Sequence, residues 1–220
     1  MRVGFPTRYS ERSQWTPNYD RLPNPENRKY IIKRHEPRSG LAVTDCIFIS
    51  SRDGEMWHRS NRAFLTPGYE STDNWIYGDC YASYPLIDIG DENYYFYTIN
   101  NHLSYHKPSP LNRYKIRKDG FACREAYGTE EVLVTKPLTF DGGKLYINFE
   151  TSALGHIYVD VLDVDGNAIS DKSIEMFGNS IDAYVSFEDG SDFSAFVGKE
   201  VKLRFTMLDA KIYAFKFDKQ

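Results

Sequence analysis

The stretch "IFISSRDGEMWHRS" at residues 47–60 begins with an apolar run, turns at Ser-Arg-Asp-Gly and continues in a segment that holds Trp57. Gly54 tolerates the positive φ of a tight hairpin turn, so Asp53 and Gly54 predict a β-hairpin. The stretch "NRYKIRKDGFACRE" at residues 112–125 repeats this pattern. Because a small sheet cannot bury both faces alone, the repetition predicts two stacked sheets, the blades of a β-propeller. Asp53 is then a turn residue, and Trp57 packs between blades.

Apolar runs bounded by Gly, Asp and Asn recur along the first half of the chain, whereas helix signals are scarce. We expect strands at residues 2–9, 46–54, 56–61, 80–90, 93–100, 111–120 and 121–128. Residues 10–45 form a long connection between the first two of these strands. Connections of that length inside compact domains are uncommon and are usually functional.

From Leu133 onward the alternation of apolar and polar residues is longer. In "KLYINFETS" at residues 144–152, Leu145, Ile147 and Phe149 face one way and the residues between them face the other, which is typical of a half-buried strand. Asp165-Gly166 marks a hairpin turn, and strands at this spacing predict a β-sandwich. The expected core members are Phe149, Val159, Val161, Phe205, Tyr213 and Phe215. The sequence therefore predicts an all-β protein, with a partial β-propeller of about two blades in residues 1–127 and an antiparallel β-sandwich in residues 128–220.

The charge and composition narrow the possible partners. Lys and Arg total 27 against 31 Asp and Glu, and no basic block could follow a phosphate backbone, so a nucleic-acid partner is not expected. No apolar run approaches the roughly 20 residues of a membrane span, and the N-terminus has no apolar signal segment. Cys46, Cys80 and Cys123 show no paired spacing, so we expect reduced, buried thiols in a cytoplasmic protein.

Several common catalytic motifs are missing from the sequence. It contains no G-x-S-x-G nucleophile elbow, no phosphate-binding Walker loop and no H-E-x-x-H zinc motif. The cysteines are also not spaced as zinc ligands. We therefore expect neither a metal nor a cofactor.

Longer phrases carry a resemblance to a known family: "FPTRY", "TDCIFISSRDGEMWHRSNRAFLTPG", "NWIYGDCYAS", "LNRYKIRKDGFACREA", "TKPLTF" and "GSDFSAFVGKEVKLRFTMLDAKIYAFKF". The chain resembles a bacterial glycoside-hydrolase-like family that is similar to the five-bladed β-propeller hydrolases of glycoside hydrolase families 32 and 43. Members of this kind end in a β-sandwich and are about twice as long. The match covers only their C-terminal half.

The resemblance implies a carbohydrate ligand and bears on catalysis. In the resembling hydrolases, the catalytic carboxylates lie on the early blades, which this chain lacks. Hydrolysis needs two carboxyl groups about 5 to 9.5 Å apart, so we expect a truncated, non-catalytic form that binds carbohydrate weakly. Two alternatives remain open: a glycosidase completed by blades from another chain or an upstream reading frame, and a purely structural interaction module.

In a propeller blade, the loop between the second and third strands opens on the same face as the loop into the next innermost strand. Residues 10–44, 66–79 and 100–110 should therefore share a rim. This rim gathers the candidate carbohydrate-binding residues Arg8, Tyr9, Asp45, Trp75, Tyr77, Asp79 and His102, with Trp15 and Tyr105 beside them. Aromatic faces and hydrogen-bonding groups together suit a sugar.

Asp79 is the rim residue that we expect to point to the propeller axis, and as a rim carboxylate it would contribute little to stability. A turn aspartate that accepts nearby backbone N–H groups is the alternative for both Asp79 and Asp45. For His102 the alternative is a solvated loop histidine. Two blades also expose sheet faces and strand edges, so we expect a homo-oligomer or association with a missing propeller half.

Overall fold

The computed structural model describes residues 1–34, 37–69, 71, 74–102 and 108–219. Strands dominate the described residues, which confirms the all-β fold class. The chain divides into two compact units, Met1–Lys115 and Ile116–Gln220. This division falls before the predicted boundary at residue 127, so residues 116–127 group with the second unit.

The first sheet of the first unit is built around one central strand. Its strands are β1 (Arg2–Gly4), β2 (Thr7–Ser10), β3 (Val43–Ser51) and β4 (His58–Leu65). Cys46 of β3 is paired with Thr7 on one side and with Leu65 on the other, so β3 is central. Pro6 has no N–H to donate and separates β1 from β2, although its carbonyl still accepts the N–H of Ile47 at 3.0 Å.

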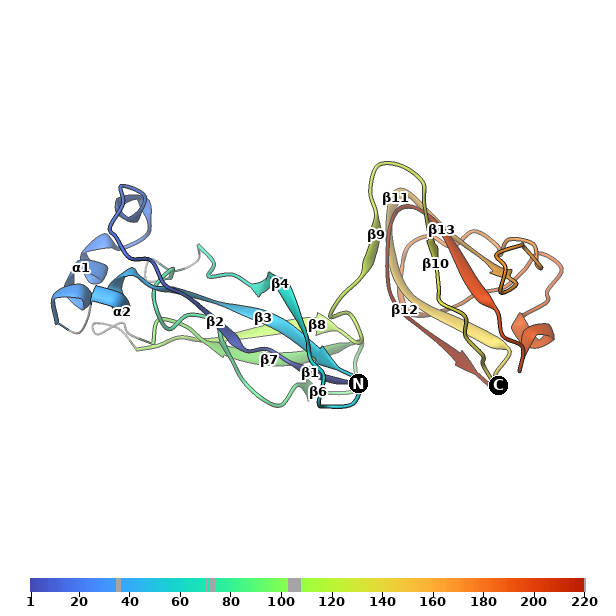
Figure 1. The fold of residues 1–220 in the computed structure, drawn as a ribbon, viewed down its shortest axis with the longest axis horizontal. Coiled ribbons are helices and arrows are strands. Elements are labelled where there is room, and N and C mark those ends of the chain that lie inside the picture. The colour runs from blue at the N-terminus through green and yellow to red at the C-terminus, as the bar shows by residue number, and fades with distance from the viewer. Residues whose placement is uncertain (35–36, 70, 72–73, 103–107, 220) are drawn as a thin grey trace. The chain divides into compact units, whose positions relative to one another are not determined.

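The second sheet of this unit repeats the plan of the first (Figure 1). Its strands are β5 (Tyr81–Ala82), β6 (Ile87–Asp88), β7 (Asn93–Ile99) and β8 (Leu111–Arg117), with β7 pairing β5, β6 and β8. Pro85 lies in the interruption between β5 and β6, as Pro6 does between β1 and β2. The two sheets correspond in number and chain order to the two predicted blades.

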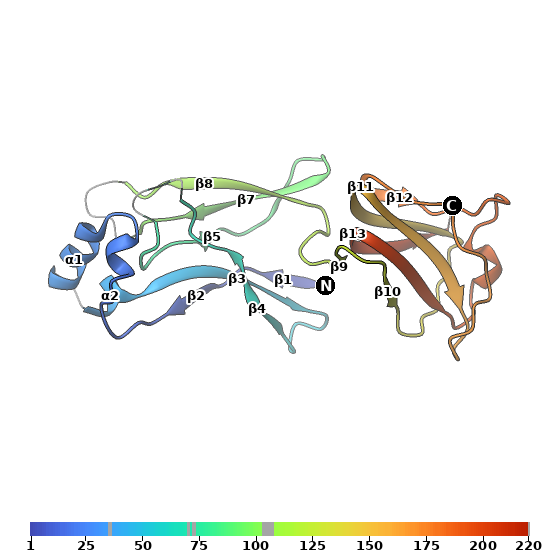
Figure 2. The same ribbon diagram turned by 90° about the horizontal axis from the view of Figure 1, so that it is seen from above.

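Aromatic side chains pack between these two sheets, which lie over each other in Figure 2. The ring of Phe5 lies 4.9 Å from Phe64 within the first sheet and 5.7 Å from Phe96 of the second, where the two rings stack. Phe96 also stacks on Tyr114 at 5.5 Å. Packing of these large apolar rings holds the two sheets together.

Helices in the connection between β2 and β3 were not predicted. The structure has η1 (Tyr19–Arg21), α1 (Pro25–Arg34) and α2 (Pro37–Leu41) there. A start signal for α1 is present in the sequence, because Pro25 fits the first helical position and the Asn24 side chain accepts the N–H of Asn27 at 3.3 Å. In the described part of the chain, no helix has both the length and the apolar character that a membrane crossing requires.

In the hairpin of residues 47–60, Asp53 lies as predicted and Trp57 does not. Asp53 is a turn residue as predicted, since its Oδ1 accepts the N–H groups of Glu55 at 2.8 Å and Met56 at 2.9 Å. Trp57 does not pack between blades: it is 43% exposed, and its indole N–H donates to the carbonyl of Gly54 at 3.2 Å. The turn keeps this ring beside its own backbone.

Two of the three cysteines are buried as predicted. Cys46 and Cys80 lie in the first unit, and burial raises the pKa of Cys46 to about 12. Cys123 is exposed, so the prediction of a buried thiol was wrong there. It lies just before the short edge strand β9, where few neighbours can cover it.

The second unit is one antiparallel sheet that bends over itself (Figure 1). Its elements are β9 (Arg124–Ala126), β10 (Glu131–Val134), β11 (Lys144–Leu162), β12 (Asn179–Tyr184), η2 (Phe193–Phe196) and β13 (Lys202–Asp218). β13 pairs with β9, β10 and the full length of β11. The strand expected at residues 121–128 was assigned to the partial propeller, but β9 pairs with β13. The two layers of the predicted sandwich are therefore halves of the same long strands.

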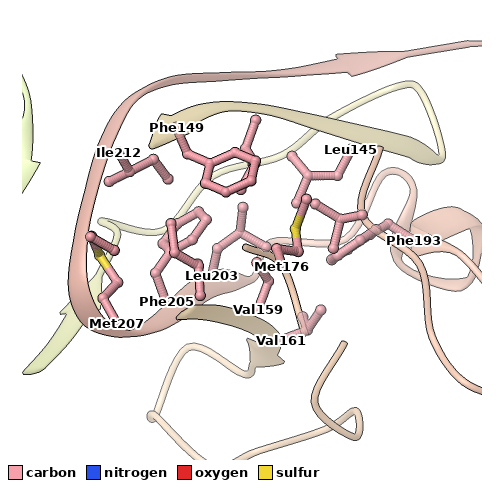
Figure 3. Packing of buried hydrophobic residues seen from close by; sticks show 14 of the residues in the cluster. Leu145, Phe149, Val159, Val161, Met176, Phe193, Leu203, Phe205, Met207 and Ile212 are labelled. Atoms are coloured by element: carbon pink, nitrogen blue, oxygen red, sulfur yellow. The ribbon is translucent and has the colours of Figure 1, made fainter. Parts of the chain in front are cut away.

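The bend brings the two halves of β11 onto one core, as Figure 3 shows. The pairing of β11 with β13 shifts register between Thr151 and His156, at the bend. Phe149 before the bend and Val159 after it both belong to one buried cluster. The core side chains of the two layers thus come from the same two strands.

Most of the predicted core is confirmed. Phe149, Val159, Val161 and Phe205 are buried, and the Asp165-Gly166 hairpin forms with a backbone bond from Gly166 to Asp163 at 3.1 Å. Tyr213 is only half-buried, because the pairing register shifts at that position and turns its side chain outward. Phe215 is 40% exposed, although its ring still lies 5.9 Å from Phe205.

Candidate functional site

Three connections of the first unit meet at one end of its two sheets, as the strand order requires. Thr44 at the start of β3 links them: its buried hydroxyl accepts the N–H of Gly78 at 3.0 Å and that of Asp79 at 2.8 Å. The same hydroxyl donates to the carbonyl of Asp79 at 3.0 Å. The backbone of His102 in turn donates to the carbonyl of Gly78 at 3.3 Å. This end of the unit, where residues 10–44, 66–79 and 100–102 meet, is here called the rim.

Asp79 lies inside the rim and not on its surface. Its side chain is 0% exposed, and its two oxygens accept the backbone N–H groups of Ile76 and Asn101, both at 3.0 Å. Burial raises the pKa of Asp79, while these hydrogen bonds and the charge of Arg28 act in the opposite direction. Asp79 is therefore a turn aspartate that accepts backbone N–H groups, which is the alternative that the sequence left open.

Arg28 of α1 supplies a buried positive charge beneath the rim. It donates to the carbonyls of Pro23 and Asn74, both at 3.3 Å, and to that of Trp75. Burial lowers the pKa of Arg28 to about 10, so it stays charged at neutral pH. Arg28 therefore fixes the loop that precedes Asp79. Sequence reasoning missed it, because an arginine in a predicted loop gives no signal of burial.

Arg8 and Asp45 face each other on paired strands at the accessible part of the rim. The Nε of Arg8 donates to Oδ1 of Asp45 at 2.8 Å, and a second nitrogen donates to Oδ2. Asp45 raises the pKa of Arg8 through this hydrogen bond. Arg8 also donates to the carbonyl of Asn61 at 2.9 Å. The pair is fork-to-fork, a geometry that fixes both side chains.

Tyrosine rings lie beside this ion pair. Tyr9 follows Arg8, and its ring meets Tyr77 edge-on, with the centroids 5.8 Å apart. The ring of Tyr81 lies 5.8 Å from the exposed His102. Burial, with Tyr77 as a further cause, raises the pKa of Tyr81 to about 12, so it stays a neutral phenol. The rim therefore offers half-buried aromatic rings next to hydrogen-bonding groups.

Three other residues were predicted to lie at the rim: Trp75, Trp15 and Tyr105. Trp75 is half-buried and has a positive φ of 70°, and its backbone carbonyl is held by Arg28. Trp15 stacks on Tyr19 at 5.0 Å and donates to Asp20 at 3.2 Å, so it packs within its own connection. Tyr105 lies outside the described residues.

Asp45 and Asp79, the two carboxylates that the structure places at the rim's strand ends, are not arranged as an acid and base pair. A glycosidase needs one carboxyl group that can protonate the leaving oxygen and a second one facing it. Asp45 is held by Arg8, and both oxygens of Asp79 are occupied by backbone N–H groups. Among the described residues, no group of three or more His, Cys, Asp or Glu side chains could hold a metal ion. The accessible chemistry is hydrogen bonding and aromatic contact.

Comparisons of the chain with protein-family models, with curated proteins and with solved structures gave no match.

Proposed function

We propose that the rim binds carbohydrate and that this chain alone does not hydrolyse it. The observation that carries the proposal is the Tyr9–Tyr77 ring pair beside the Arg8–Asp45 ion pair. Aromatic rings contact the C–H faces of a sugar, and fixed, planar polar groups bind its hydroxyls. The resemblance to glycoside-hydrolase-like proteins supports the same ligand class.

The protein would then be a glycoside-hydrolase-like protein that binds carbohydrate. Neither Asp45 nor Asp79 can act as the general acid from its present contacts, so catalysis would need carboxylates other than these two. Weak binding is expected, in the millimolar range, which corresponds to about 4 kcal/mol.

Substitution of the tyrosines tests the proposal. Tyr77→Ala and Tyr9→Ala should weaken glycan binding about tenfold, measured by calorimetric titration of the full chain against a panel of oligosaccharides. Tyr127→Ala is the matched control, because that ring is 80% exposed on the second unit. Equal affinities for all three variants would contradict a rim site, and absence of binding to every oligosaccharide would favour the structural-module alternative.

We also propose that the chain self-associates in a reducing, cytoplasmic environment. The edge strands β1, β4 and β8 each present backbone groups along one side, and such edges favour pairing with another chain. The exposed, unpaired thiol of Cys123 fits a reducing compartment. A monomer mass by light scattering at high protein concentration would contradict the association.

A further inference from the structure

A pocket opens on the outer face of the second unit, on the first half of its bent sheet. It has a volume of about 190 Å³. β11, β12 and β13 form its floor and sides, and the turn after β8 closes one end. The lining residues include Asp119, Tyr146, Asn148, Asp182, Phe215 and Lys216. Pockets for drug-sized ligands begin at about 300 Å³, so this pocket fits a smaller ligand.

Asn148 gives the pocket an unsatisfied acceptor. Its side chain is 4% exposed, and its Nδ2 donates to the carbonyl of Lys118 at 2.7 Å. Its Oδ1 is buried and accepts no hydrogen bond from any residue that the structure describes. Buried polar groups without a partner are rare in native proteins, so each one calls for an explanation. A donor from a bound ligand would satisfy this oxygen.

The turn that closes the pocket is held firmly by Arg117. The guanidinium of Arg117 donates to Glu150 at 3.2 Å, Asn179 at 2.9 Å and the carbonyl of Ser180 at 3.0 Å. It also lies 4.5 Å from the ring centre of Tyr213. These contacts hold the turn in place without a ligand. They also fix the carbonyl of Lys118, which accepts the hydrogen bond from Asn148.

The charges around the pocket balance. Lys118 and Lys216 carry two positive charges, and Asp119 and Asp182 carry two negative ones. A strongly charged ligand would be repelled by one of these pairs. A neutral molecule with several hydroxyl groups can donate to the carboxylates and to Asn148 and accept from the ammonium groups. Its apolar side would lie against the ring of Tyr146.

We infer that this pocket binds one neutral sugar residue, free or at the end of a chain. The site is separate from the rim in residues and in unit, and it does not depend on the rim's function. It would give the protein a second contact with carbohydrate, with the Asn148 amide oxygen accepting a sugar hydroxyl. The ring of Tyr146, which faces Lys216 at 5.3 Å, would form the pocket wall.

Titration of the full chain with methyl glycosides of glucose, galactose, mannose, xylose and arabinose tests this inference. At least one glycoside should shift the side-chain amide resonances of Asn148 in an NMR spectrum. Asp182→Ala and Tyr146→Ala should each weaken that binding about tenfold. Asp182 is exposed, so its loss leaves the fold intact.

Tyr158→Ala is the matched control, because Tyr158 also lies on β11 with a lysine, Lys172, 5.4 Å from its ring centre. Its affinity should equal that of the unmodified chain. The rim variant Tyr77→Ala should keep the Asn148 shifts, so failure of the rim and failure of the pocket give different results. Absence of any Asn148 shift would overturn the inference. Equal shifts of the Asn148 amide with glutamine, a zwitterion close in size to a methyl pentoside, would also overturn it.

Discussion

The carboxylate of Asp79 receives two backbone N–H groups in a place that water does not reach. Replacing it with alanine leaves both donors buried without an acceptor and leaves the charge of Arg28 uncompensated. The free energy of unfolding of Asp79→Ala should therefore fall by about 2 to 4 kcal/mol. Urea unfolding followed by circular dichroism measures this change.

The exposed Asp88, which accepts the N–H of Gly90 at 2.9 Å, provides the control for that substitution. Asp88→Ala should cost less than about 1 kcal/mol. An unchanged transition for Asp79→Ala would agree with the sequence-based expectation of a rim carboxylate and would contradict the buried geometry.

Asp79 should also make stability depend on pH. Burial raises its folded pKa above the ordinary value of 3.8, so the folded protein holds the proton more tightly than the unfolded chain. The contribution of Asp79 to the free energy of unfolding is therefore largest at low pH. It declines as pH rises from the pKa of Asp79 in the unfolded chain to its higher pKa in the folded protein. The difference between the unmodified chain and Asp79→Asn should shrink as pH rises from about 4. A difference that grows with pH would contradict the raised pKa.

At the residue scale, the sequence predicted which residues lie near one another at the rim. It did not predict the directions in which their side chains point. The turn and strand order placed Arg8, Tyr9, Asp45 and Tyr77 at one end of the sheets. Whether a carboxylate points outward depends on neighbours far along the chain, such as the backbone N–H of Asn101. No local pattern encodes that contact.

At the scale of elements, the bend of β11 depends on Gly155. A Cβ added there would lie 2.3 Å from the carbonyl oxygen of Asp209 and 2.8 Å from that of Leu208. The two strands would have to separate at the bend, so Gly155→Ala should lower the free energy of unfolding by about 2 to 3 kcal/mol. Thermal or urea unfolding measures the loss.

Gly166→Ala provides a comparison for the bend. Gly166 has a positive φ of 100° and open space around it, so alanine there costs only backbone strain, about 1 kcal/mol. Equal losses for the two variants would contradict a steric requirement at Gly155.

The alternation of apolar and polar residues predicted the strands of the second unit well where the pairing of β11 with β13 is regular. It failed at Tyr213, because a register shift changes which face the following residues occupy, and period-two reasoning assumes that no shift occurs. The helices α1 and α2 were missed for a different reason. Their connection is polar and short of apolar periodicity, so only the Asn24-Pro25 start signal could have indicated them.

At the scale of the whole molecule, the second unit should fold by itself if it begins at residue 116. Ala126 of β9 belongs to its buried cluster, and Arg117 binds Glu150 and the backbone of β12. A polypeptide of residues 116–220 should melt cooperatively in a calorimeter. One that starts at Glu131, near the boundary expected from the sequence, lacks these contacts and should melt at a lower temperature. Identical melting of both would show that residues 116–130 add nothing to the unit.

We propose that the chain binds carbohydrate without cleaving it, and one NMR time course tests both the binding and the absence of cleavage. The purified full chain is mixed with an oligosaccharide panel, and saturation transfer to the sugars and the anomeric signals are recorded together over a day. We predict saturation transfer to at least one oligosaccharide, reduced in Tyr77→Ala, with no new reducing-end signals. Saturation transfer to none of the sugars, or new reducing-end signals that depend on the unmodified chain, would contradict the account.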